Sequence, residues 1–519
     1  MQEDNDVVLH FYEGYLRNQK QLCKELAVRP EEDRNETEKK LICRAYAKWG
    51  KDLAAHLHGA YAFLVWDEKP RELVAFRDPL GIRSVYYALL PDGELLCAPD
   101  IGTITDDARY QKELDAEALQ LYMMFGYPIG EKTLFRGIKK LMPGQILIGQ
   151  NGTYRIKSCE RTWPKPEVDR SEAKWIRQIE QTMKTIVEED QTNFDFLRGC
   201  SFLSSGVDSS YLLASTGLRY SCGIGYEETG FSEAEDAKKT AKRLGTQYEE
   251  LRITSDRFFA DLPKVIRNMG LPTADASTAA FAIGCQQLAG RYDFFLSGEG
   301  ADEFFAGYHV YQRASELGKK EALYLGCDGI MEQDAAMALL KQDDRFPCEN
   351  LLKDISELPD DSDELMRMLL VDQSLWLEGD ILFGAGRAAK AAGLELLMPY
   401  ADDRMQKLAA QIPSSLLHKD GCGKYIFRKT AMRILPEEIA FRNKIGFRVP
   451  IRLWMREERH RRRIEEKLFG EVSESFFDPN RLRRYWDAFC EGNDEQWHIL
   501  YAVFVFVLWY EECWCITVP

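Results

Sequence analysis

Two short loops carry the residue types that could do chemistry in this chain, and the first contains Ser204, Ser205, Gly206, Asp208 and Ser209. Hydroxyl groups and the unpaired backbone N–H groups at the start of a helix are donors that suit a polyphosphate. The glycine would let the backbone approach the phosphates and adopt a turn that a side chain would block. A carboxylate repels phosphate, so Asp208 is predicted to hold a magnesium ion that bridges phosphate oxygens. The alternative is a Ser- and Gly-rich turn that only caps a helix.

The second loop runs from Ser297 to Glu303 and is acidic and rich in glycine. Both loops directly follow an apolar, strand-like run, so they are predicted to lie at strand ends that face one cleft. Asp302 would complete the magnesium site, because magnesium prefers a few carboxylates together with phosphate oxygens and water. Glu299 would remain as a general base that takes a proton from an incoming amine. The alternative for this segment is an acidic surface turn.

The periodicity of the chain predicts the elements that position these loops. Up to about residue 150, short apolar runs such as 60–66 and 72–76 alternate with Pro, Gly and Asp turns, which predicts a sheet-rich domain. From residue 172, amphipathic stretches such as 173–188 and 233–244 alternate with short apolar runs. This alternation predicts a parallel α/β sheet with ligands at the strand ends. We therefore expect a first domain at 1–153, a polar, proline-bearing linker at 154–171 and a second domain at 172–519.

Composition excludes several classes of function. The chain has 519 residues, 45% of them hydrophobic, and its 68 basic and 84 acidic residues give a net charge of −16. This charge argues against a broad nucleic-acid or anionic-membrane surface. The apolar run 498–510 is shorter than the ~18 to 20 residues of a membrane helix and is predicted to be a buried helix. The 13 scattered cysteines and the acidic, signal-free start predict a cytoplasmic protein with reduced thiols.

Together the two loops resemble those of the asparagine synthetase family, whose ATP-pyrophosphatase domain has an S-G-G-x-D-S loop and an S-G-E-G-x-D-E turn. The first loop differs from the family's loop only in having Ser205 where the family has glycine. The resemblance covers nearly the whole chain, and the further matches, in the family's order, include Ile224 to Glu227, Pro272, Asp275, Ser277, Trp376, Leu377, Pro399, Tyr400, Asp402, Lys424, Tyr425 and Arg442 to Phe447. It implies an α/β protein in which a partial Ntn-hydrolase-like α+β sandwich precedes a parallel-sheet domain of the ATP-pyrophosphatase type (PP-loop, adenine nucleotide α-hydrolase-like).

The resemblance also implies a reaction in two steps. ATP and a carboxylate give an acyl-adenylate and pyrophosphate, and an amine then attacks the activated carbonyl while AMP leaves. Carried over by position, the first loop would hold the pyrophosphate portion of ATP and Ser297 and Gly298 would lie against the nucleotide. Asp208 and Asp302 would bind magnesium. Lys444 would neutralise the charge that builds on the phosphates in the transition state.

The first domain resembles the second part of a glutamine-hydrolysing domain, through Phe76 to Arg83 and Leu141 to Gly144. Glutamine-using members begin Met-Cys-Gly, whereas Met1 is followed here by Gln2. Glu13-Gly14-Tyr15 stands where the family has N-G-E, and Asn35 to Glu38 departs from S-D-T-E. Cys23 and Cys43 are no substitutes, because an interior cysteine has no free α-amino group to act as its base. We expect a degenerate class II glutamine amidotransferase-like domain without glutaminase activity.

The sequence also departs from the family on the substrate side. Residues 386–391 stand where the family has D-R-x-S-M-A, and Leu397 stands where an arginine is common. Loss of an arginine could change how a carboxylate is held, since bidentate carboxylate recognition is typical of arginine. Asp380 and Glu395 remain as nearby carboxylates. Each is interpreted either as a catalytic residue or as a member of a structural ion pair.

Three functions follow as hypotheses. The first is an ATP- and magnesium-dependent ligase that makes asparagine from aspartate, with ammonia that is free or comes from a separate glutaminase, and with a homodimer as a candidate assembly. Glu299 favours it, because β-lactam synthetases have tyrosine at that place. The second is a related enzyme acting on another small carboxylate, such as a β-lactam or lasso-peptide cyclase. The third is a non-catalytic nucleotide-binding regulatory protein. A misplaced start codon or a truncated gene is a further explanation of the absent Met-Cys-Gly segment.

Overall fold

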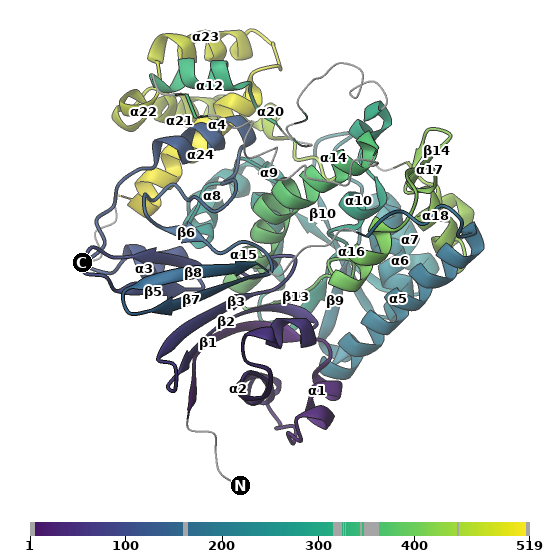
Figure 1. Cartoon of the computed structure of the whole chain (residues 1–519). Coiled ribbons are helices and arrows are strands. Elements are labelled where there is room, and N and C mark those ends of the chain that lie inside the picture. Colours follow the sequence, from purple (N-terminus) through teal and green to yellow (C-terminus); the bar gives the residue numbers. More distant parts are fainter. Residues whose placement is uncertain are drawn as a thin grey trace.

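The computed structural model describes residues 6–158, 164–314, 324, 326, 329–342, 345–346, 363–443 and 446–514. An antiparallel N-terminal sheet lies beside an α/β unit built on a parallel sheet, and helices from the C-terminal part cover one end of the molecule (Figure 1). This arrangement confirms the predicted α/β class, with a sheet-rich first half followed by a parallel sheet.

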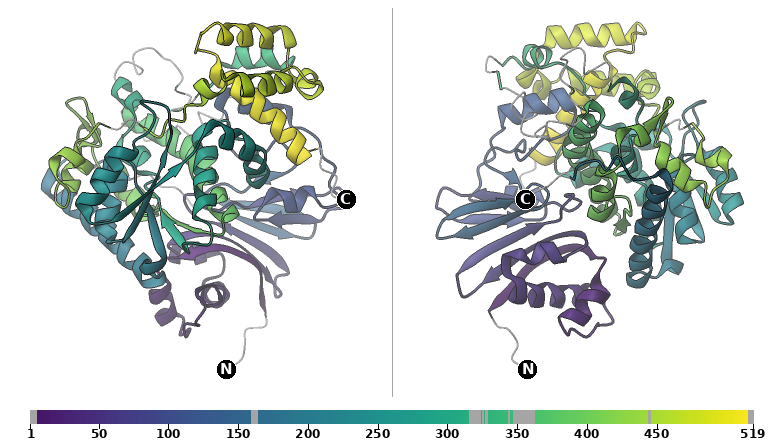
Figure 2. Two further views of the ribbon diagram at one scale, coloured as in Figure 1. Left: turned by 180° about the vertical axis from the view of Figure 1, so that it is seen from behind. Right: turned by 45° about the vertical axis from the view of Figure 1, so that its right-hand side comes forward.

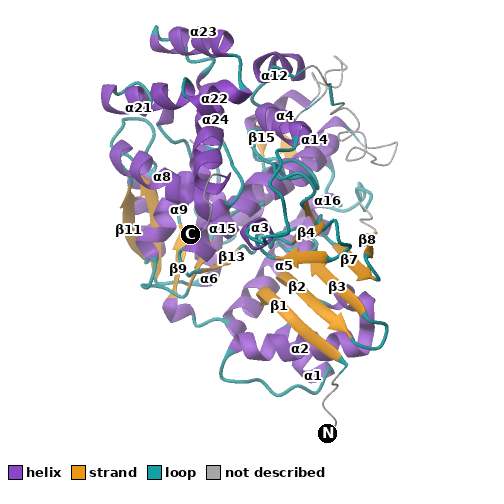
Figure 3. Ribbon diagram, turned by 90° about the vertical axis from the view of Figure 1, so that its left-hand side faces the viewer, coloured by secondary structure: helices purple, strands orange, loops and turns teal. Residues whose placement is uncertain are grey.

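The N-terminal half is a sandwich of two antiparallel sheets backed by helices. The larger sheet has the order β1-β2-β3-β7-β8 and the smaller one the order β5-β4-β6. Helices α1 and α2 cover one face of the larger sheet, as Figure 3 shows, through a core that includes Leu41, Phe63 and Phe76. The other face packs on the smaller sheet through Leu64, Tyr87 and Leu147. Its elements are β1 (Val7–Leu16), α1 (Gln19–Glu25), α2 (Arg34–Trp49), η1 (Gly50–His56), β2 (Gly59–Asp67), β3 (Glu72–Arg77), β4 (Tyr86–Leu89), β5 (Leu95–Ala98), α3 (Ile101–Thr105), α4 (Ala116–Phe125), β6 (Lys139–Lys140), β7 (Gln145–Gln150) and β8 (Thr153–Ser158).

The second half is built on a five-stranded sheet of order β11-β10-β9-β12-β13 in which every neighbouring pair is parallel. Helices cover both of its faces (Figure 2). The strand order reverses between β9 and β12, where Ser201 pairs with Leu296, and such a switch point is where open α/β sheets bind ligands. The two predicted loops follow these two strands. The strands of this half are β9 (Gly199–Phe202), β10 (Tyr220–Gly225), β11 (Gln247–Arg252), β12 (Phe294–Leu296), β13 (Glu395–Leu397), β14 (His418–Lys419) and β15 (Cys422–Gly423).

Several helices of the second half begin at a side chain that caps their first turn. Helix α16, for example, begins after Asp402, whose side chain accepts a hydrogen bond from Arg404 N. The helices are α5 (Glu172–Asn193), η2 (Phe196–Arg198), α6 (Val207–Thr216), α7 (Ala234–Leu244), α8 (Ser255–Met269), α9 (Ala276–Leu288), α10 (Ala301–Phe305), η3 (His309–Arg313), α12 (Gln333–Leu340), α14 (Glu364–Asp372), η4 (Gln373–Leu382), α15 (Phe383–Ala391), α16 (Asp403–Ala410), α17 (Ser414–Leu417), α18 (Tyr425–Ala431), α19 (Glu437–Ala440), α20 (Ile451–Trp454), α21 (Glu458–Leu468), α22 (Glu471–Phe476), α23 (Pro479–Cys490), α24 (Trp497–Trp509) and η5 (Tyr510–Trp514).

Helix α24 confirms the buried helix predicted at the end of the chain. Its residues from Leu500 to Trp509 are all buried, and Tyr122 of α4 donates a hydrogen bond to Ala502 O at 2.9 Å. Within the described part of the chain, no helix has the length and apolar character needed to cross a membrane.

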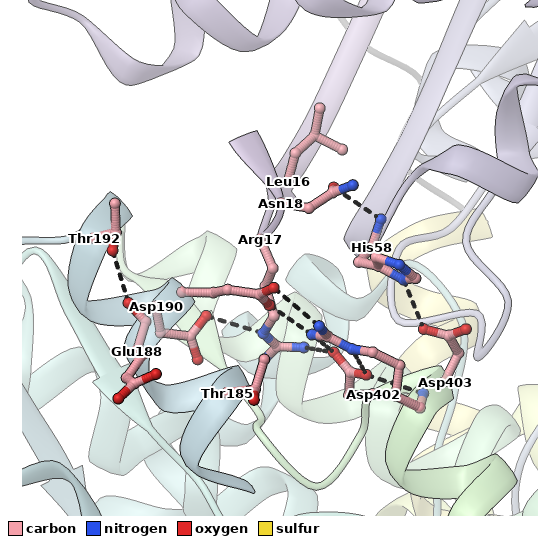
Figure 4. Close-up of polar contacts among 12 residues, drawn as sticks. Leu16, Arg17, Asn18, His58, Thr185, Glu188, Asp190, Thr192, Asp402 and Asp403 are labelled. Atoms are coloured by element: carbon pink, nitrogen blue, oxygen red, sulfur yellow. Dashed lines mark hydrogen bonds and ion pairs between the residues drawn. The ribbon is translucent and has the colours of Figure 1, made fainter. Parts of the chain in front are cut away.

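Two buried ionic clusters join the halves. Arg17, at the end of β1, donates from Nε to Asp190 and from Nη1 to Asp402, both at 2.9 Å, and all three side chains are fully buried (Figure 4). In the second cluster, Arg77 and Lys140 each contact a different oxygen of Glu378 at 2.8 Å. Glu378 belongs to the π-helical segment η4, and such segments often occur at functional sites. The N-terminal half is thus anchored to α5, to the start of α16 and to η4 of the second half.

Candidate active site

A cavity of about 510 Å³ opens where β9 and β12 end. Both predicted loops line it, since its wall includes Ser204, Asp208, Ser209, Ser297, Gly298, Glu299 and Asp302. The tertiary structure therefore brings together residues that are about ninety positions apart in sequence. This is the convergence that the two strand-end loops predicted.

The first loop turns directly into α6, so the backbone N–H groups at the start of this helix face the loop. The hydroxyls of Ser204 and Ser209 are bonded within the loop: Ser204 N donates to Ser209 Oγ at 3.0 Å, and Gly206 N donates to Ser204 Oγ at 3.1 Å. Ser205 is buried behind the cavity wall, where its N–H donates to Glu233 Oε2 at 3.2 Å. Ser204 and Ser209 are thus the loop serines that face the cavity.

The backbone angles of Gly206 do not by themselves require glycine. The residue has φ −76° and ψ 160°, a conformation that any residue adopts, and it precedes α6 as its N-cap. Gly206 does not line the cavity either, and its contact with phosphate stays a prediction.

Lys424 lies between the two predicted magnesium ligands. Its Nζ is 2.7 Å from Asp208 Oδ2 and 2.8 Å from Asp302 Oδ1, and its side chain is 3% exposed. Composition predicts an ordinary solvated lysine here, so the family match was the only signal that could have found it. Gly307 makes room for the contact, because a Cβ on it would lie 2.0 Å from Asp302 Oδ1 and 2.2 Å from Lys424 Cε.

The residues around Asp208 and Asp302 suit a magnesium ion. Asp208 Oδ1 is buried without a hydrogen-bond partner among the described residues, so it has a lone pair to offer to a cation at the cavity wall. In the described ranges no group of three or more His, Cys, Asp or Glu side chains could hold a metal by itself. Two carboxylates that leave the other positions to phosphate oxygens and water are a typical magnesium arrangement.

The second loop packs against the first. Ser297 is buried and donates its hydroxyl proton to Glu299 Oε1 at 2.9 Å. A Cβ on Gly298 would lie 3.5 Å from Ser209 N, so this glycine sits against the start of α6. Behind the loop, burial and the nearby Asp302 raise the pKa of Glu303, whose carboxylate accepts a hydrogen bond from Tyr308. Glu299 and Asp302 are the acids of this loop that line the cavity.

Tyr400 contacts the first loop and was matched in the sequence without a role. Its hydroxyl donates to Asp208 O at 2.8 Å, and the side chain is fully buried. Lys444 and Ile445 lie outside the described residues, and Asn443 and Gly446 on either side of them line the cavity. The role predicted for Lys444 therefore stays a prediction.

The departures noted on the substrate side lie outside the cavity. Leu397 is fully buried in β13, and Arg387 donates twice to Asn268 O, at 3.2 and 2.8 Å. Asp380 is buried and accepts a hydrogen bond from Thr273, whereas Glu395 forms ion pairs with Arg34 and Arg83. Phe281, Trp376, Ile381 and Ala385 are among the residues that do line the cavity.

Comparison with known proteins agrees with this geometry. The family described as "Asparagine synthase" matches residues 190–511, which contain both loops, Lys424 and Tyr400. The chain belongs to the asparagine synthase family. The family described as "Glutamine amidotransferase domain" matches residues 1–161.

Individual relatives extend along most of the chain. "Asparagine synthetase [glutamine-hydrolyzing] 1" of Bacillus subtilis is 27% identical, over 96% of this chain and 84% of its own length. "Putative asparagine synthetase [glutamine-hydrolyzing]" of Mycobacterium tuberculosis is 26% identical, over 90% of this chain and 79% of its own. A more distant relative, "Amidase chyE" of Penicillium rubens, is 24% identical over 52% of this chain and 43% of its own. As a member of this family the chain is a ligase that uses ATP to form amide bonds.

Proposed function

We propose that this member of the family adenylates aspartate and transfers ammonia to it, giving asparagine, AMP and pyrophosphate. The observation that carries the proposal is that Asp208 and Asp302, which follow adjacent strands and line one 510 Å³ cavity, both contact the buried Lys424. This arrangement combines hydroxyls, helix N–H groups, carboxylates and a buried cation, which is what a metal-bound triphosphate requires.

Each residue has a role in this proposal. Ser204, Ser209, Gly206 and the start of α6 hold the β and γ phosphates, with Ser205 supporting the loop from behind. Ser297 and Gly298 lie against the nucleotide. Asp208 and Asp302 would hold magnesium, which supplies charge to the phosphates when bound. Lys424 places a positive charge where charge builds on the departing pyrophosphate. Lys444 is proposed to add to it.

The second step needs a base and a good leaving group. A carboxylate is a poor electrophile, and its mixed anhydride with AMP is a reactive one. Glu299 faces the cavity and is oriented by the Ser297 hydroxyl, so it is placed to take a proton as the amine attacks. The proposal assigns no direct role in catalysis to Glu303.

The test is a pyrophosphate-release assay with ATP, magnesium and a panel of carboxylates, aspartate first, with ammonium or glutamine as nitrogen source. We expect pyrophosphate release that depends on aspartate, and AMP and asparagine in equal amounts when ammonium is present. Asp208→Asn should abolish release, whereas Lys239→Met, at an exposed site, should leave it unchanged. Pyrophosphate release that does not respond to aspartate would contradict the choice of substrate.

Ammonia is the proposed nitrogen donor, free or supplied by a separate glutaminase. Burial raises the pKa of the Cys23 and Cys43 thiols, so neither is a good nucleophile at neutral pH. Glu13, in place of the expected asparagine, forms an ion pair with Lys390. The measurement is glutamate release from glutamine by purified protein, and we expect none.

One observation favours a carboxylate substrate other than aspartate. Phe281, Trp376 and Ile381 make part of the cavity wall apolar, and such a wall suits a carboxylate larger and less polar than aspartate. The same panel should therefore include β-amino acids and short peptides. A higher kcat/KM with one of these than with aspartate would indicate an amide-forming enzyme of another substrate class.

The domain limits at residues 153 and 172 and a homodimeric assembly also stay proposals.

A further inference from the structure

A second, much smaller cavity of about 20 Å³ lies between the N-terminal half and α15. Its lining includes Arg83 and Ser84, which precede β4, and Gly386, Arg387 and Lys390 of α15. None of its lining residues belongs to the wall of the 510 Å³ cavity. It is therefore a separate feature at the contact between the two halves.

Two arginines that line this cavity each have one side-chain N–H group without a hydrogen-bond partner among the described residues. Arg83 Nε and Arg387 Nη1 are buried, and neither has a partner among the residues that the structure describes. The other nitrogens of Arg387 bond to the carbonyl oxygen of Asn268, at 3.2 and 2.8 Å. Buried N–H groups are nearly always paired in folded proteins, so these two point to an unseen acceptor.

The lining also carries an excess of positive charge. Lys390 is paired with Glu13, and Arg83 with Glu395. Arg387 has no carboxylate partner in the described part of the chain. The side chain of Arg387 is partly exposed and stays charged, and the part of a guanidinium that leaves water normally lies beside an anion. A water molecule would satisfy the N–H groups but would leave this charge uncompensated.

We propose that this cavity is a binding site for a compact monovalent anion, held by Arg83 Nε and Arg387 Nη1. A volume of about 20 Å³ admits a single ion or one carboxylate group. A halide and the carboxylate of a small acid share the required chemistry, because each accepts two charge-assisted N–H bonds. The anion would connect the segment before β4 to α15. Since Ala385 of α15 lines the large cavity, occupancy would help to fix that wall.

Crystals soaked in bromide test the site directly on the wild-type chain. We expect an anomalous peak between Arg83 and Arg387 that persists at millimolar bromide. Addition of formate separates the two sources: loss of the peak identifies a carboxylate site, and its persistence a halide site. A water molecule in place of bromide would overturn the proposal.

Thermal unfolding tests the charge requirement. At constant ionic strength, replacing gluconate, which is too large for the cavity, by bromide or formate should raise the unfolding temperature of the wild type by about 2 °C. Arg387→Met should lose this response, and Arg462→Met, whose side chain is 83% exposed, should keep it. An equal response in all three proteins would overturn the proposal. These readouts do not depend on the ligase activity.

Gly386 offers a matched gain-of-charge variant. A Cβ there would lie 3.3 Å from Ile82 O and 3.7 Å from Arg83 Nη1, so Gly386→Asp would bring a carboxylate beside the guanidinium of Arg83. We expect this variant to unfold at a higher temperature in gluconate than Gly386→Asn, which fills the space without charge. Replacing gluconate by bromide should not change the unfolding temperature of Gly386→Asp. Equal unfolding temperatures for the two variants would count against an anion.

Discussion

Removal of the buried cation between the two loops should destabilise the fold and create a dependence on magnesium. Lys424→Met leaves Asp208 and Asp302, whose side chains are 9% and 11% exposed, without the nitrogen that each contacts. Because both oxygens contact one atom, they lie at most about 5.5 Å apart. At an effective dielectric constant of about 20 their repulsion is about 3 kcal/mol. Breaking a buried ion pair by removing one partner costs about 3–5 kcal/mol, so the two magnitudes agree.

The measurement is urea unfolding of the wild type and the variant, with and without magnesium, in the absence of ATP. We expect the variant to lose about 3–5 kcal/mol of unfolding free energy without magnesium. Magnesium should restore part of the loss, because the divalent ion takes the place of the ammonium group between Asp208 and Asp302. Lys239→Met removes a lysine that is 71% exposed and paired with Asp236, and it should leave the unfolding curve unchanged.

Two results together would refute this reasoning. A loss below about 1 kcal/mol would mean that the buried contacts of Lys424 contribute no more than surface pairs do. If magnesium does not change the unfolding curve of the variant, Asp208 and Asp302 cannot share a cation. A loss of stability without magnesium rescue would keep the structural role of Lys424 and reject the metal site.

Three further predictions concern other buried groups. Burial raises the pKa of Glu38 from 4.5 to about 7, so the stability that its neutral form contributes is complete below pH 4.5 and is lost as pH rises through about 7. Over this pH range the wild type should lose up to about 3 kcal/mol of unfolding free energy relative to Glu38→Gln. A difference in unfolding free energy between the two proteins that does not change with pH would contradict this. Glu378→Gln leaves two buried cations undercompensated and should cost about 3–5 kcal/mol in urea unfolding, whereas a loss as small as that of a surface pair would contradict it. Tyr400→Phe removes the hydrogen bond to Asp208 O and should cost about 1 kcal/mol and weaken ATP binding in calorimetry; an unchanged affinity would argue against positioning of the first loop.

Local patterns in the sequence determined the elements and the position of the site along the chain. The run at 294–296 is β12, the stretch 233–244 contains α7, and the apolar segment at 498–510 overlaps the buried helix α24. Periodicity is a property of neighbouring residues, so it can be found without the fold. The strand-end positions of the loops containing Asp208 and Asp302 followed from the same patterns, because parallel strands present their carboxyl ends at one edge.

The tertiary structure alone decided which distant side chains share that edge. Lys424 lies 216 positions from Asp208, adopts a left-handed backbone with φ 57°, and reaches both acids because Gly307 leaves room. It also decided that Ser205 lies behind the cavity and that Leu397 and Arg387 lie outside it. Such placements depend on how helices and loops pack across hundreds of residues, and no local pattern encodes that packing. The sequence by itself determined the chemistry available at two strand ends, and the packing of the whole chain decided that a buried lysine joins them.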